Sequence, residues 1–168
     1  MEGIKLDDIK LHLIDGSDKE VLRNLFNLYH HDLSIIDNSL FPTVDQRGFY
    51  DYTAIEEYFH NEFLRDELFV YLIRYSGNIA GFCVISKAPY VKSGCDYCIQ
   101  EFFITGNYRK KSLGSETCKF VFNKHPGRYC LQIIGNNIKA KSFWRKLINV
   151  VGAEIVIENN DTVFTFLV

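Results

Sequence analysis

The segment between Leu68 and Ile85 constrains the fold more than any other part of the sequence. Two apolar runs, 68–75 and 79–85, are rich in β-branched and aromatic residues, and Ser76-Gly77-Asn78 separates them. Such runs on either side of a Gly/Asn turn predict a β-hairpin. The chain therefore contains antiparallel β-structure, and the flanking segments decide what covers it.

Helical periodicity is found on both sides of this hairpin. Apolar residues recur at helical spacing in four segments, which are 17–34, 53–63, 112–124 and 140–148. Ser17 is the expected N-cap of the first helix, and Glu20 three residues later completes a capping box. Five further β-rich segments lie at 4–14, 97–105, 129–134, 153–158 and 162–168. The order β-α-α-β-β-β-α-β-α-β-β predicts an α+β fold with a mixed sheet covered by helices.

Length and charge narrow the class of protein. The 168 residues suit one domain, and no repeat, low-complexity tract or linker divides residues 1–168. A net charge of −2 is too small to attract nucleic acid non-specifically. No apolar run approaches the roughly 20 residues of a membrane span, and the start Met1-Glu2-Gly3 lacks the basic and apolar regions of a secretory signal. We therefore expect a cytoplasmic protein that binds neither nucleic acid nor membranes.

Five cysteines raise the question of redox or metal chemistry. Cys95 and Cys98 form a C-x-x-C pair, but a tetrahedral zinc site needs two more ligands at suitable spacing. A thioredoxin-like pair lies between a strand and the helix that it opens, whereas this pair leads directly into a β-rich segment. We expect reduced, structural cysteines and no metal site.

The most informative segment for function is 101–115. A β-rich run ends at Thr105, the basic loop Arg109-Lys110-Lys111 follows, and a helix opens with Ser112-Leu113-Gly114-Ser115. The first turn of a helix leaves backbone N–H groups unpaired at the positive end of the helix dipole. Basic side chains and a glycine at that position predict a phosphate-binding site. A basic turn before an ordinary surface helix is the alternative.

This arrangement resembles the GNAT superfamily of N-acetyltransferases. Members carry Q/R-x-x-G-x-G/A between their fourth strand and third helix, and here Arg109, Ser112 and Gly114 occupy those positions, with serine in place of the first glycine. The residues that match a second family pattern, an Asn, an Ala and an aromatic pair, are Asn137, Ala140, Phe143 and Trp144. The resemblance covers most of the chain and implies a central sheet of about seven strands with helices on both faces.

The resemblance implies acetyl-CoA as the co-substrate. Its pantetheine arm would pair with the fourth strand much as an added strand does, and its pyrophosphate would lie on the amides of 110–115. The residues that the resemblance assigns to the cofactor are Phe103, Ile104, Arg109, Lys110, Lys111, Ser112, Leu113, Gly114, Ser115, Asn137, Ala140, Phe143 and Trp144. Core packing is the alternative role for Phe143 and Trp144.

The resemblance also implies direct attack of a neutral amine on the thioester. Glu101 is the candidate catalytic base, because many members carry a carboxylate on this strand and strand alternation puts Glu101 on the face of Phe103. A structural salt bridge is the alternative role for Glu101. Trp144 stands where many members have the tyrosine that protonates the departing thiolate. The tyrosines considered as replacements are Tyr97, Tyr108 and Tyr129, and a thiol with a pKa of about 8.5 also leaves without an acid.

The acceptor is less constrained than the cofactor. Acidic and aromatic residues in 29–62 favour a cationic amine on a small molecule or a peptide, and solvated loop charge is the alternative. Homodimers are common in the family. A non-catalytic acyl-CoA-binding or regulatory module of the same fold is the alternative to an active N-acetyltransferase.

Overall fold

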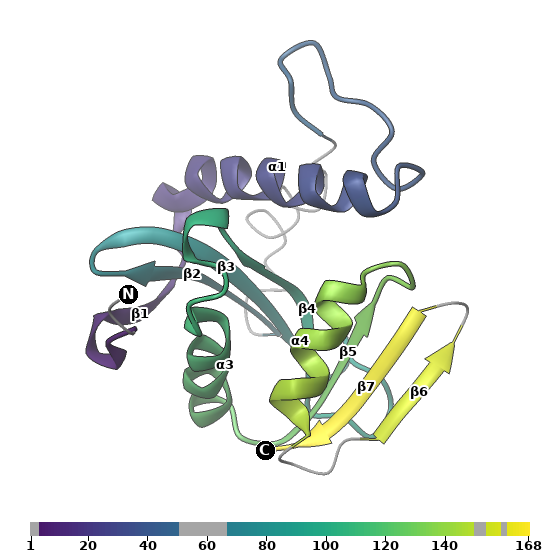
Figure 1. Cartoon of the computed structure of the whole chain (residues 1–168). Helices are drawn as coiled ribbons and strands as arrows, with labels where there is room; N and C mark the ends of the chain where they lie inside the picture. The colour runs from purple at the N-terminus through teal and green to yellow at the C-terminus, as the bar shows by residue number, and fades with distance from the viewer. Residues whose placement is uncertain (1–3, 51–66, 150–153, 159–160) are drawn as a thin grey trace.

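A computed structural model describes residues 4–50, 67–149, 154–158 and 161–168. In these residues one seven-stranded sheet has the strand order β1-β2-β3-β4-β5-β7-β6 (Figure 1). The strands are β1 (Ile9–Leu13), β2 (Leu68–Tyr75), β3 (Asn78–Lys87), β4 (Tyr97–Ile104), β5 (Arg128–Ile133), β6 (Glu154–Glu158) and β7 (Asp161–Leu167). The α-helices are α1 (Lys19–Ile36), α3 (Leu113–Lys124) and α4 (Ile138–Ile148). The α+β fold with a mixed sheet of about seven strands is confirmed, and the helix predicted at 53–63 lies outside the described residues.

Strand pairing explains why the sheet is mixed. β4 and β5 pair in parallel, and the other neighbouring strands pair antiparallel. The predicted hairpin is β2–β3, closed by Ser76 and Gly77 with φ angles of 48° and 81°. Positive φ at both central residues is the requirement of a tight turn that matches the twist of the strands.

Helices cover both faces of the sheet, as predicted. On one face, Leu22 and Phe26 of α1 pack with Val70 and Leu72 of β2. The intervening residues of β2 pack on the opposite face in the cluster that contains Leu113 of α3 and Trp144 and Ile148 of α4. Alternation along one strand therefore separates the core into two layers. The residues of β2 in this second layer are Tyr71 and Ile73.

The start of α1 differs from the sequence prediction. A 3-10 turn, Gly16–Asp18, precedes the helix, and the capping box is formed by Asp15 and Asp18 rather than by Ser17 and Glu20. The Asp15 carboxylate accepts hydrogen bonds from the N–H and the hydroxyl of Ser17 at 2.8 and 2.6 Å, and Asp18 accepts the Asp15 N–H at 3.1 Å. Ser17 lies inside this 3-10 turn, and Asp18 rather than Ser17 is the N-cap residue of α1.

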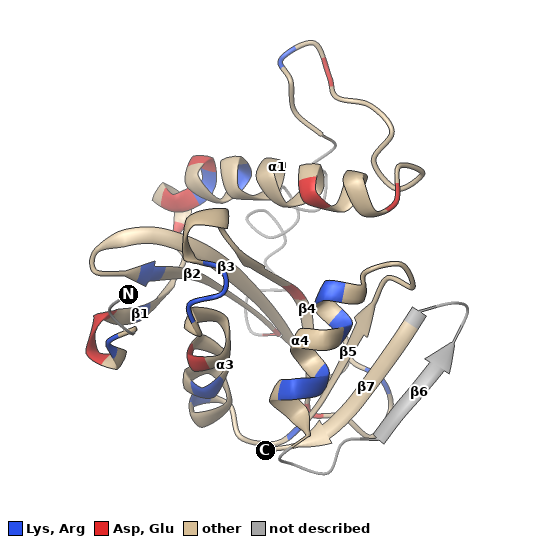
Figure 2. Cartoon of the chain, viewed as in Figure 1, with Lys and Arg blue, Asp and Glu red and all other residues tan. Residues whose placement is uncertain are grey.

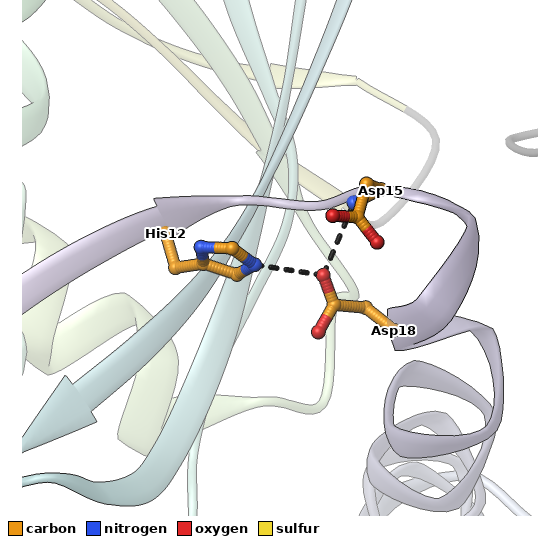
Figure 3. Close-up of side chains that lie close together, drawn as sticks. All are labelled: His12, Asp15 and Asp18. Atoms are coloured by element: carbon orange, nitrogen blue, oxygen red, sulfur yellow. Dashed lines mark hydrogen bonds and ion pairs between the residues drawn. The ribbon is translucent and has the colours of Figure 1, made fainter.

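His12 completes this cluster at the end of β1. Its Nε2 lies 2.8 Å from Oδ2 of Asp18 (Figure 3). The donor atoms of His12, Asp15 and Asp18 lie within 4.8 Å of one another, a spacing that would also suit a metal ion. The hydrogen bonds of the 3-10 turn before α1 account for the arrangement, so we assign no metal to it.

The first strand is shorter than the predicted 4–14. A 3-10 turn, Leu6–Asp8, occupies its expected beginning. Asp8 instead holds the turn of the β2–β3 hairpin, because its carbonyl and carboxylate accept the N–H and hydroxyl of Ser76 at 2.9 Å each. None of the helices described here is both long enough and apolar enough to cross a membrane.

Candidate active site

β4 and β5 separate part-way along their length. Within the described strands, their pairing covers Tyr97–Ile99 against Tyr129–Leu131, whereas β4 continues to Ile104. The 100–104 segment therefore offers strand backbone beyond the ladder on the β5 side, where an extended ligand can add as a further strand. Phe103 and Ile104, the predicted pantetheine contacts, lie in this segment with buried side chains.

Glu101 lies on β4 just beyond the last rung of that ladder. Its neighbour Phe103 packs in the α1-facing cluster, and the hydroxyl of Tyr29 on α1 donates a 2.6 Å hydrogen bond to Oε2 of Glu101. The Tyr29 ring also packs against Phe103, with ring centroids 5.7 Å apart. Glu101 and Phe103 thus share a face, as alternation predicts. Among the described residues Glu101 makes no ion pair, so the structure gives no support there to a salt-bridge role.

Burial changes the protonation of Glu101. Loss of solvent around the carboxylate raises the pKa of Glu101 to about 7, and the Tyr29 hydrogen bond opposes this by stabilising the charged form. A carboxylate with a pKa near neutral exchanges protons readily at physiological pH. This combination of burial, a hydrogen-bond partner and an adjacent opening is the arrangement expected of a catalytic base.

The raised pKa predicts a pH-dependent effect on stability. The folded carboxyl of Glu101 titrates near 7 rather than at its ordinary 4.5, so the protein loses stability as the pH rises between these two values. Above both values the loss is about 3 kcal/mol, since one pKa unit corresponds to about 1.4 kcal/mol. Glu101→Gln should therefore raise the free energy of unfolding by up to about 3 kcal/mol at high pH and leave it nearly unchanged at low pH.

Urea unfolding of the two proteins below and above this pH window measures the effect. Glu20→Gln is the matched control, because the Glu20 side chain is 73% exposed. Its difference from the wild type should stay within about 0.5 kcal/mol at either pH. A Glu101→Gln protein that gains nothing at high pH would show that the carboxylate is well solvated.

The loop between β4 and α3 has the geometry expected of an anion site. Lys110 and Ser112 have positive φ angles of 60° and 64°. The first intrahelical bond of α3 runs from the Glu116 N–H to the Ser112 carbonyl at 3.0 Å, so the amides of 113–115 precede it at the open end of the helix. Lys110 and Lys111 are exposed beside them. Figure 2 shows basic residues on this loop and along α4, so the amides and the cations together favour a bound phosphate.

Ser112 stands where the family pattern has its first glycine, and its conformation explains that preference. Its φ of 64° and ψ of 0° are left-handed, which costs an L-residue roughly 1–2 kcal/mol. Glycine adopts this region without the clash. Its greater conformational freedom in the unfolded chain offsets about 0.5–1 kcal/mol of that gain in stability. Ser112→Gly should therefore increase the free energy of unfolding by about 0.5–1 kcal/mol in urea titrations.

Ser115→Gly is the control for that substitution. It makes the same chemical change in the first turn of α3 and also removes the 2.8 Å hydrogen bond from the Ser115 hydroxyl to the Ser112 carbonyl. Glycine should therefore destabilise the protein by about 0.5–1 kcal/mol at this position. Opposite signs at the two positions are the expected result. Equal destabilisation by both glycines would mean that Ser112 is not strained.

Gly114 lies against the aromatic rings of Phe143 and Phe102. A Cβ atom added there would lie 3.4 Å from two ring carbons of Phe143 and 3.5 Å from the Phe102 ring, which is ordinary contact. This fits the glycine or alanine that the family pattern allows. The structure thus brings the first turn of α3 against Phe143 of α4, so that the two predicted patterns meet in space.

Arg109 has protein partners for its guanidinium. Its Nε donates a 2.6 Å hydrogen bond to the Ile104 carbonyl, one terminal nitrogen pairs with Asp32 of α1, and the group lies over the Phe103 ring. These contacts tie the end of β4 and the loop to α1. Arg109 therefore braces the predicted phosphate site, while Lys110 and Lys111 supply its exposed positive charge.

The second pattern also combines structural and surface positions. Asn137 is the N-cap of α4, because its side chain accepts the Ala140 N–H at 3.0 Å. The half-buried Phe143 ring stacks on Phe102, with centroids 5.9 Å apart. Trp144 is only 5% exposed and packs edge-on against Phe102. Core packing is thus the observed environment of Trp144, and Phe143 lies at the edge of that core.

The three tyrosines considered as general acids lie away from Glu101. Tyr129 is fully buried and donates to the His125 carbonyl at 2.7 Å, and burial raises the pKa of its hydroxyl. Tyr97 stacks on Tyr129 at the paired end of β4. Tyr108 packs against Tyr75 at the other end of the strand.

Tyr29 is the phenol that the structure brings to Glu101, and the sequence did not identify it. Tyr29 precedes Glu101 by 72 residues, and Asp32 precedes Arg109 by 77. Spacing of three residues on α1 gives Tyr29 and Asp32 a common face. No local sequence pattern predicts that this face of α1 contacts the end of β4.

Comparisons with known proteins agree with this geometry. The model of the acetyltransferase (GNAT) family matches residues 25–148. The chain is similar in structure to an acetyltransferase from Thermus thermophilus, with a TM-score of 0.69, 14% identity and coverage of 95% of this chain and 97% of that one. It is also similar to FdhC, a nucleotide-linked sugar GNAT, with a TM-score of 0.67, 17% identity and coverage of 99% and 90%.

A third similar structure contains a cofactor derivative. Arabidopsis thaliana Naa50, in complex with the bisubstrate analogue CoA-Ac-MVNAL, has a TM-score of 0.57, 19% identity and coverage of 94% of this chain and 97% of that one. A comparison with curated proteins found no match. The family model spans most of the chain, and the fold agrees with it. The chain therefore belongs to the GNAT family of acetyltransferases.

Proposed function

We propose that this protein transfers an acetyl group from acetyl-CoA to a primary amine by direct attack, with Glu101 as the base. The observation that carries the proposal is the position of Glu101. It is a partly buried carboxylate with a pKa of about 7, next to the point where β4 and β5 separate. Acetyl-CoA supplies the activated thioester.

The residues present fit this cofactor. The amides of 113–115 at the start of α3, together with Lys110 and Lys111, match the charge of a pyrophosphate. The backbone of 100–104 matches the amides of an extended pantetheine arm. Phe143 and Ala140 of α4 give a half-buried surface beside the start of α3.

The proton balance gives Glu101 its role. A lysine-like amine has a pKa of about 10.4 and arrives protonated. Ionised Glu101 takes this proton, and the amine nitrogen attacks the thioester carbonyl carbon. The carbon–sulfur bond then breaks, and the nitrogen releases its second proton to solvent as the amide forms. A thiol with a pKa of about 8.5 leaves as a thiolate without an acid. Tyr29 keeps the Glu101 carboxylate in place through its 2.6 Å hydrogen bond.

The described acidic residues narrow the search for the acceptor site. Asp32 pairs with Arg109, Asp45 pairs with Arg47, and Asp37 accepts two hydrogen bonds from Ser39. These carboxylates are used locally, so Glu101 with Tyr29 and Phe103 is the better candidate for meeting the amine. The predicted acidic residues in 51–62 lie outside the described residues.

A thiol-release assay tests the proposal. Acetyl-CoA is mixed with the protein and a panel of polyamines, amino acids, aminoglycosides and peptides with free N-termini, and released thiol is measured across pH. Amine-dependent release that rises with an apparent pKa near 7 is expected. Tight binding of acetyl-CoA without turnover by any amine would favour the non-catalytic module instead.

A further inference from the structure

A cluster of thiols lies where β4 and β5 are paired, before the point at which the two strands separate. Cys98 and Cys130 are partners in the middle rung of the parallel ladder. Adjacent strands lie about 4.8 Å apart, within the 4.4–6.8 Å that separates the Cα atoms of a disulfide.

Cys95 adds a third thiol from the loop before β4. Asp96 fixes this loop to the start of β5, because its N–H donates to the Arg128 carbonyl and its carboxylate accepts the Arg128 N–H, each at 2.8 Å. The loop turns through a 3.0 Å bond from the Cys95 N–H to the Lys92 carbonyl. These bonds hold Cys95 next to the start of β5, two residues before Cys130 on that strand, and all three cysteines are free.

The surroundings favour a thiolate at Cys130 and thiols at its neighbours. Hydrogen bonds from Cys98 and from the Lys92 N–H lower the pKa of Cys130, although burial opposes them. The hydrogen bond to Cys130 and burial raise the pKa of Cys98, and burial raises that of Cys95. Cys95 and Cys98 are partly exposed, whereas Cys130 is 4% exposed behind them. A thiolate beside a resolving thiol is one feature of peroxide-sensitive cysteines, and the partly exposed Cys95 and Cys98 form the solvent side of this cluster.

We propose that Cys95, Cys98 and Cys130 form a thiol–disulfide site in which hydrogen peroxide oxidises Cys130 and Cys98 resolves the product. The Cys130 thiolate attacks one peroxide oxygen, the O–O bond breaks, and the hydroxide that leaves takes up a proton. The Cys98 sulfur then attacks the sulfenic acid, the S–O bond breaks, and the Cys98 proton leaves with the hydroxide as water. Two thiols and one peroxide become one disulfide and two waters. This site does not depend on the proposed acetyl transfer.

Thiol counting on the full chain tests the site. The reduced protein is treated with one molar equivalent of hydrogen peroxide, alkylated under denaturing conditions and analysed by intact mass and peptide mapping. We expect the loss of two of the five thiols, so that three alkyl groups are added instead of five, and a peptide in which Cys98 is linked to Cys130. Dithiothreitol should restore all five thiols.

Two serine variants form a matched pair for this experiment. Cys130→Ser should lower the rate of thiol loss at least tenfold, whereas Cys118→Ser should react like the wild type, because burial raises the pKa of the Cys118 thiol well above its ordinary value. Cys98→Ser should leave a trappable sulfenic acid on Cys130 or a Cys95–Cys130 disulfide. Uniform slow oxidation of all five thiols, a disulfide between other cysteines, or a link between two chains would overturn the proposal. The wild-type peptide map decides the question even if a serine variant fails to fold.

Discussion

Glu101→Gln should lower kcat/KM for amine acetylation about 100-fold at pH 8, because a positioned general base contributes 10²–10⁴-fold. Glutamine retains the shape of the side chain and still accepts the Tyr29 hydrogen bond, but it cannot take a proton from the amine. The affinity for acetyl-CoA should stay within about twofold, since the predicted cofactor contacts lie on the backbone of β4 and at the start of α3. Steady-state kinetics and a binding titration on the same protein separate the two effects. Equal kcat/KM in both proteins across the pH range would remove Glu101 from the base role.

Tyr29→Phe is the companion variant for this test. The Tyr29 hydrogen bond lowers the pKa of Glu101, so its loss should move the acidic limb of the pH profile upward by about one unit. At pH well above that limb the rate should recover toward the wild type. A variant that loses activity equally at all pH values would indicate that Tyr29 has a structural role alone.

Reversal of the two loop charges should weaken acetyl-CoA binding about 30–100-fold, or about 2–3 kcal/mol, because hydrogen bonds to charged groups contribute about 1.5–3 kcal/mol each. Lys110→Glu/Lys111→Glu places two negative charges beside the expected pyrophosphate, and both side chains are exposed, so the fold should tolerate them. Calorimetric titration with acetyl-CoA at low and high salt gives the affinity and its electrostatic part.

Two controls assign that loss to the pyrophosphate. Lys5→Glu/Lys10→Glu changes the net charge equally at exposed positions near β1, and should alter the affinity by less than threefold. S-acetylpantetheine has no pyrophosphate, so its KM should be the same in the wild type and in the Lys110/Lys111 variant. A loss of equal size with S-acetylpantetheine would mean that the variant disturbs the site in another way.

Local pattern was enough to predict most of the elements. The β2–β3 hairpin follows from apolar runs on either side of Ser76 and Gly77, and α3 and α4 follow from helical spacing. The predicted start of α1 differs from the observed one, because Asp15 and Ser17 can both cap the same turn. Only the geometry shows that Asp15 accepts the hydrogen bonds there. Alternation also placed Glu101 and Phe103 on one face.

Long-range contacts explain what the sequence missed. Tyr29 meets Glu101, and Asp32 meets Arg109, only because α1 packs across the end of β4. The side-by-side position of Cys98 and Cys130 depends on the register of two parallel strands, which no local spacing encodes. The cofactor roles predicted for Arg109 and Trp144 rest on family positions and stay predictions, and the contacts described for these two side chains are with other residues of this chain.

Calorimetric titration of the wild-type protein with acetyl-CoA tests the central claim, that the opening between β4 and β5 and the start of α3 form an acetyl-CoA site. One molecule should bind each chain with a Kd of roughly micromolar order, about −8 kcal/mol. The Lys110→Glu/Lys111→Glu protein should bind at least tenfold more weakly under the same conditions. No heat of binding at millimolar acetyl-CoA, in a protein whose unfolding transition is intact, would contradict the account.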